Sequence, residues 1–132
     1  MNDEVAASVA RAQVRVWREL AGVERIEDCR MLGHFVLDVL DILYGSWRDA
    51  VEVVADGPDE WAMRHVACTI FDMGVAAGYE DDPVPGALPG CGGIRALARG
   101  WAEAAGGFTV EQVPAFSPSG GVACSYVFRR TV

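Results

Sequence analysis

Asp72-Met73-Gly74-Val75-Ala76-Ala77-Gly78 is followed, after an acidic run rich in proline, by Gly90-Cys91-Gly92-Gly93-Ile94. The first stretch comes directly after a β-like run, and the second opens a helix-like run. A carboxylate at a strand end can accept a hydrogen bond from an exocyclic amine. Glycines let backbone N–H groups approach phosphates, and a helix N-terminus favours negative charge. The two stretches therefore predict a nucleotide site, and the alternative interpretation is that the glycines only form turns.

The composition is that of one folded protein, and we expect a single domain over residues 1–132. The chain has 52% hydrophobic and 23% charged residues, a balance typical of globular proteins. Its formal net charge of -8 argues against sequence-independent binding to DNA or RNA, which depends on clustered Lys and Arg. A glycine-rich loop binds phosphate locally, so the acidity does not exclude a nucleotide.

The chain contains no apolar run of transmembrane length, and Met1-Asn2-Asp3-Glu4 is acidic, unlike a signal peptide. We therefore expect a cytoplasmic protein with no membrane partner. The cysteines lie far apart, mostly within apolar runs and without the spacing of a zinc site: Cys29, Cys68, Cys91 and Cys124. In a reducing compartment we interpret them as small core residues, with Cys91 alone in a loop.

Apolar residues at steps of three and four predict two amphipathic helices in the first third of the chain. The first extends from about Asp3 to Ala21, with Trp17 in its apolar stripe, and Gly22 ends it. The second extends from about Ile26 to Tyr44 and has a broad apolar face. Both helices are therefore expected to pack on a common core.

Two aspartates, Asp38 and Asp41, lie three residues apart on one edge of the second helix. They fit either a solvated helix edge or a contact to a metal ion or a nucleotide. His34 on the same helix is interpreted as a packed or surface histidine.

After the second helix the pattern changes to short β-like runs. Val51–Val54 and Trp61–Phe71 flank the turn Asp56-Gly57-Pro58-Asp59. Two strands joined by such a turn predict an antiparallel hairpin. Within the second strand, His65 is expected to be half-exposed.

A helix at Ile94–Ala105 and strands at Phe108–Val113 and Val122–Phe128 follow. The expected order of elements is therefore α-α-β-β-α-β-β. This order predicts an α/β (α+β) two-layer sandwich, with a mainly antiparallel mixed sheet and helices packed on one face.

With this order, the chain resembles the GHKL (Bergerat-fold) ATPases. Within them it looks most like the small anti-sigma-factor serine kinases of bacteria and the histidine-kinase-like ATP-binding domains. The stretch from Asp72 to Gly78 is similar to the family's first glycine box, Asp-x-Gly-x-Gly/Ala, and the stretch from Gly90 to Leu97 is similar to the second. The first helix and the closing hairpin are also similar, so the resemblance covers nearly the whole chain.

The resemblance implies ATP or ADP with Mg²⁺ as ligand. It implies that Asp72 meets the adenine amino group and that Gly74 and Gly78 shape the pocket floor. It also implies that three glycines hold the lid against the phosphates: Gly90, Gly92 and Gly93. The partners that it implies are a regulatory protein (a sigma factor, an anti-anti-sigma factor or a two-component protein) or a second copy in a homodimer.

The second helix departs from the family pattern, in which a Glu is followed four residues later by a Mg²⁺-binding Asn. Aligned by its distance from Val51, Asp41 takes the Asn position, where its oxygens could hold Mg²⁺. Leu37 takes the Glu position, and leucine cannot act as a general base. A shift by one residue places Asp38 at the Glu position but Ile42 at the Asn position. No register restores the motif.

The preferred hypothesis is a degenerate GHKL-type nucleotide-binding regulatory module, a pseudoenzyme that acts by protein–protein interaction in bacterial signalling or transcription control. Trp17, Trp47 and Trp101 are expected near the surface, where large aromatic residues suit an interface. The alternative is an active ATP-dependent serine kinase and anti-sigma factor, with Asp38 as the base. Two further hypotheses are a histidine phosphotransfer protein with His34 as acceptor, and a shared architecture with purely structural glycines.

Overall fold

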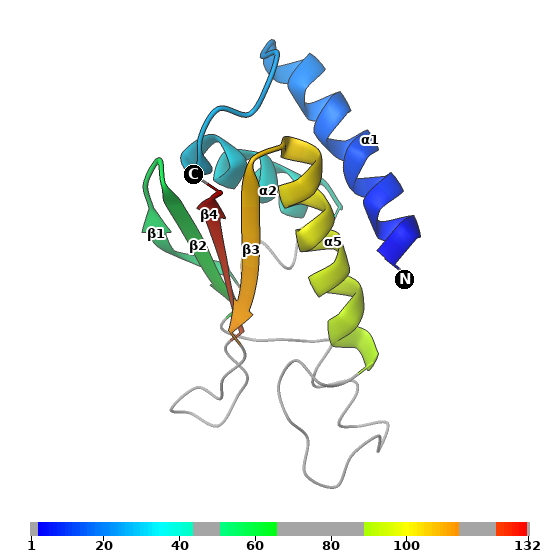
Figure 1. Cartoon of the computed structure of the whole chain (residues 1–132), viewed down its shortest axis with the longest axis vertical. Helices are drawn as coiled ribbons and strands as arrows, with labels where there is room; N and C mark the ends of the chain where they lie inside the picture. Colours follow the sequence, from blue (N-terminus) through cyan, green and yellow to red (C-terminus); the bar gives the residue numbers. More distant parts are fainter. Residues whose placement is uncertain (1–2, 44–50, 66–88, 114–123, 132) are drawn as a thin grey trace, which may run out of the picture.

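The computed structural model describes residues 3–43, 51–65, 89–113 and 124–131, with the backbone alone for residue 43 and residues 89–93. The elements follow in the order α1 (Asp3–Ala21), α2 (Cys29–Leu43), β1 (Val51–Asp56), β2 (Glu60–His65), α5 (Pro89–Ala105), β3 (Phe108–Val113) and β4 (Ser125–Arg130). Figure 1 shows the helices packed on one face of the sheet. The predicted two-layer sandwich is confirmed.

The described strands form one sheet in the order β1-β2-β4-β3, and all their pairings are antiparallel. β1 and β2 are the predicted hairpin, closed by a hydrogen bond from the Gly57 N–H to the Glu60 carbonyl (2.9 Å). Between Val53 and Ala55 the pairing shifts by a bulge, which lies on an edge strand, where such irregularities discourage pairing with other chains.

Alternating side chains of the two central strands form the floor of the core. Trp61 and Met63 of β2 and Tyr126 and Phe128 of β4 are buried on the helix-facing side. The rings of Trp61 and Phe128 lie 5.9 Å apart. On the other face, Glu60, Arg64 and Arg129 are exposed, whereas Ala62 is buried and Val127 is half-buried, so this face is the more polar of the two.

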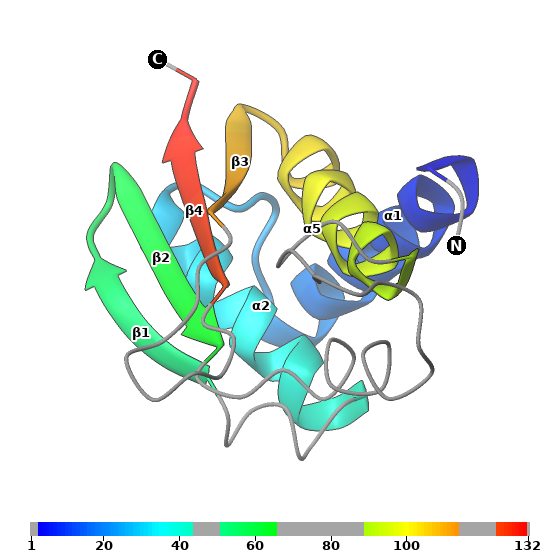
Figure 2. The ribbon, with the colours of Figure 1, turned by 90° about the horizontal axis from the view of Figure 1, so that it is seen from below.

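α1 packs mainly against α5, and the two helices run side by side in Figures 1 and 2. Small residues permit the close approach. A Cβ atom at Gly100 would lie 2.8 Å from the Cβ of Ala10 and 3.2 Å from the carbonyl oxygen of Ala6. The helix pair therefore depends on the absence of a side chain at this position.

Aromatic rings join the three helices. Phe35 of α2 lies edge-on to Trp17 of α1 (5.8 Å between ring centroids) and to Trp101 of α5 (6.0 Å). Trp101 is only 2% exposed, and its indole N–H donates to Gln13 Oε1 (2.7 Å). The prediction that Trp101 lies near the surface is therefore wrong, because α1 covers it; Trp47 lies outside the described residues.

The second helix begins three residues later than predicted, at Cys29 rather than Ile26. The carboxylate of Asp28 caps it by accepting a hydrogen bond from the Met31 N–H (2.8 Å). The Cys29 N–H donates to the Pro58 carbonyl (2.9 Å), so the helix begins against the β1–β2 turn. Ile26 is buried before the cap rather than within the helix.

α5 begins at Pro89, five residues before the predicted start at Ile94. The glycine cluster, predicted at the helix start, and Cys91, predicted in a loop, therefore both belong to its first turns. The helix ends as expected, at Gly106 and Gly107, whose φ values of 81° and 84° favour glycine.

The last strand also differs from its prediction. β4 continues to Arg130 instead of ending at Phe128, because Arg129 pairs with Glu60 and Arg130 pairs with Phe108. The predicted strand Trp61–Phe71 is confirmed only as far as His65, and its remainder lies outside the described residues.

His65 lies on the core face and is only 6% exposed, so the prediction that it is half-exposed is wrong. It occupies the same face as Trp61 and Met63, at alternate positions of the strand. Its ring centroid lies 5.7 Å from that of Tyr126. Burial lowers the pKa of His65, because the imidazolium ion is desolvated there.

We expect the free energy of unfolding to decrease as the pH falls below 6.5, the ordinary pKa of histidine. Since the pKa of His65 is lower in the folded state, the unfolded chain binds more protons between the two pKa values, and stability is lost as the pH falls through that interval. Urea unfolding at about pH 7.5 and about pH 5.5 measures the loss. His65→Gln should reduce it, and His34→Gln, at an exposed position of α2, should not. Equal pH dependence in the wild type and His65→Gln would contradict this explanation.

We also expect Gly33→Ala to destabilise the fold. A Cβ atom at Gly33 would clash with three ring atoms of Trp61, which is 2% exposed and has no room to move. Overpacking typically costs about 1–3 kcal/mol, which exceeds the gain of about 1 kcal/mol from replacing a helical glycine by alanine.

Urea unfolding of Gly33→Ala beside Gly57→Ala measures the effect. Gly57 is the matched control, because a Cβ atom there would meet only the Glu60 carbonyl, at 3.5 Å. A stability of Gly33→Ala equal to the wild type would show that the approach of α2 to β2 is looser than described.

Candidate functional site

One end of the sheet holds the described part of the predicted nucleotide site, the glycine-rich start of α5. β2 ends there at His65, β3 ends there at Val113, and β4 begins there, since neighbouring strands are antiparallel. α5 begins at the same end, because it runs opposite to β3 across the short connection at Gly106 and Gly107. Figure 2 looks at this end from below. We call it the glycine end, and define it by His65, Pro89–Gly93, Val113 and Ser125.

The first turns of α5 contain Gly90, Gly92 and Gly93. The first N–H groups of a helix have no partner within the helix, and the helix dipole favours an anion beside them. Glycine lets another group come close to that backbone. Pro89 suits the first helical position, because its missing N–H is not needed there. These residues are compatible with the predicted contact to phosphates, which stays a prediction.

The other half of the predicted pocket, with Asp72, Gly74 and Gly78, lies outside the described residues. The structure therefore does not test whether these residues meet the glycines of α5. Asp41 lies on α2, which meets α5 at the Phe35–Trp101 ring contact. Trp101 follows Gly93 by about two helical turns, so this contact between α2 and α5 lies about two turns from the glycine-rich start of α5.

The acidic residues of α2 and the leucine beside them lie in surroundings that differ from those of a catalytic base. Asp38 is exposed, and its Oδ2 accepts a hydrogen bond from the Trp17 indole N–H of α1 (2.8 Å). Leu37, at the position where the resemblance expects a general base, packs against the hydrophobic core. Asp41 is exposed near the end of the helix. In the described part of the chain, no group of three or more His, Cys, Asp and Glu residues could hold a metal ion.

The sequence interpretation missed a polar row on the core face at the glycine end. Tyr126 is 3% exposed, and its hydroxyl accepts a hydrogen bond from Gln112 Nε2 (3.0 Å), while its ring packs beside His65. The row crosses β2, β4 and β3. The alternation of Trp61 and Met63 could have placed His65 on this face, but the neighbourhood of Tyr126 follows only from the pairing of the strands.

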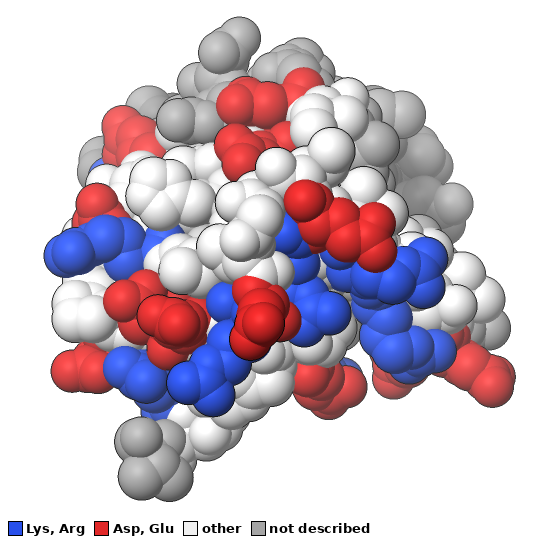
Figure 3. Space-filling view, turned by 90° about the horizontal axis from the view of Figure 1, so that it is seen from above, with Lys and Arg blue, Asp and Glu red and all other residues white. Residues whose placement is uncertain are grey.

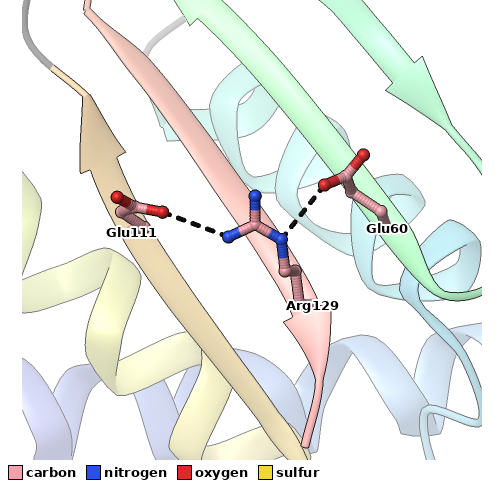
Figure 4. Close-up of polar contacts among 3 residues, drawn as sticks. All are labelled: Glu60, Glu111 and Arg129. Atoms are coloured by element: carbon pink, nitrogen blue, oxygen red, sulfur yellow. Dashed lines mark hydrogen bonds and ion pairs between the residues drawn. The ribbon is translucent and has the colours of Figure 1, made fainter.

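On the outer face of the sheet, charged side chains of neighbouring strands form ion pairs. Arg129 of β4 donates from Nε to Glu60 of β2 and from Nη1 to Glu111 of β3, each at 3.1 Å (Figure 4). The hydrogen bond to Glu111, together with that to Glu60, raises the pKa of Arg129. Arg64 and Glu52 form a similar pair at 2.7 Å. Exposed pairs of this kind align strands and contribute little stability.

The end of the molecule opposite the glycine end also carries mixed charges. Figure 3 views it from above, and basic and acidic side chains alternate over it. Arg130 and Asp59 lie 3.8 Å apart, and Arg30 and Asp56 lie 3.5 Å apart. This face favours no ligand of a single charge sign.

The chain matches no family model, no curated protein and no solved structure. Among the described residues, no helix has both the length and the apolarity needed to cross a membrane. The residues themselves therefore carry the functional interpretation.

We expect Mg²⁺ alone to leave the melting temperature unchanged, because Mg²⁺ is usually held by one or two carboxylates together with phosphates. In the presence of ATP, Mg²⁺ should raise the melting temperature further than ATP does, and Asp41→Asn should reduce that increment. Asp3→Asn, at an exposed acidic residue of α1, is the matched control. A response to Mg²⁺ without nucleotide, or an unchanged increment in Asp41→Asn, would contradict the assignment of Asp41.

Proposed function

We propose that the chain is a degenerate GHKL-type regulatory module, which binds a nucleotide without transferring its phosphate and acts by contact with a regulatory protein. The partner class is a sigma factor, an anti-anti-sigma factor or a two-component protein, and the compartment is the cytoplasm. Two described cysteines, Cys29 and Cys124, are buried, and Cys29 is a free thiol, which suits a reducing compartment.

The observation that carries this proposal is what the side chains of Leu37 and Asp38 contact on α2. Removal of a proton from a substrate hydroxyl needs a base that faces the substrate. Leu37 has no proton acceptor and packs against the core, and Asp38 is held by the indole of Trp17 on a different helix. At these two positions α2 therefore makes packing contacts and a bond to another helix, and supplies no base that faces a substrate.

The support for nucleotide binding comes from the glycine-rich start of α5. Gly90, Gly92 and Gly93 lie in the first turns of α5, at the end of the sheet from which the chain continues toward Asp72. A phosphate group at such a helix start needs no catalytic residue. Nucleotide binding can therefore persist where phosphate transfer is lost.

Calorimetric titration with ATP and ADP, with and without Mg²⁺, tests the nucleotide. We expect binding that Asp72→Ala abolishes, because the adenine amino group loses its acceptor. Asp59→Ala, in the β1–β2 turn at the other end of the sheet, should leave binding unchanged. No binding by the wild type at millimolar nucleotide would overturn the nucleotide part of the proposal.

Incubation with labelled ATP and candidate partner proteins tests the absence of catalysis. We expect no phosphoserine on any partner, since no general base is supplied by Leu37. Phosphate transfer to a partner serine would overturn the pseudoenzyme and favour the serine kinase.

A further inference from the structure

We draw no further inference here: the strongest candidate, the open apolar groove of about 280 Å³ between α1 and the C-terminal half of α2, bordered by the exposed side chains of Leu20 and Ile42, carries nothing because no feature of the described residues shows what covers it.

Discussion

The placement of the helices depends on the contacts of Phe35. This ring is fully buried in α2 and lies edge-on to Trp17 of α1 and Trp101 of α5. α1 packs mainly on α5, so these ring contacts and the close approach at Gly100 determine where α1 lies above the sheet. Protein interiors are closely packed, and a helix held by two such contacts has little freedom to shift.

The same packing explains why α2 differs from a catalytic helix. Trp17 is positioned by Phe35, and from there its indole N–H reaches Asp38. On the other side, Leu37 adds to the core. At the positions where the resemblance would place catalytic side chains, Leu37 thus packs on the core and Asp38 bonds to another helix. The glycine-rich start of α5, on a different element, is independent of this change.

Much of the fold could be predicted from the sequence because its signals are local. The limits of α1 follow from the spacing of its apolar residues, and the β1–β2 turn follows from its turn residues. The end of α5 follows from its two glycines, which adopt positive φ angles. The errors have other causes. The true start of α2 depends on the Asp28 cap, and the burial of Trp101 depends on α1. Of the candidate site, the sequence supplied the glycines of α5 but missed the row of His65, Tyr126 and Gln112.

The sequence by itself determined the order of the elements, the layer architecture and the presence of an apolar residue at Leu37, because residue type and periodicity are properties of the chain. Only the tertiary structure decided that His65 lies beside Tyr126, that Asp38 is bound by Trp17, and that Leu20 and Ile42 border one groove. Each of these facts joins residues from different elements. Their distance in space depends on how helices and strands pack, which no local pattern specifies.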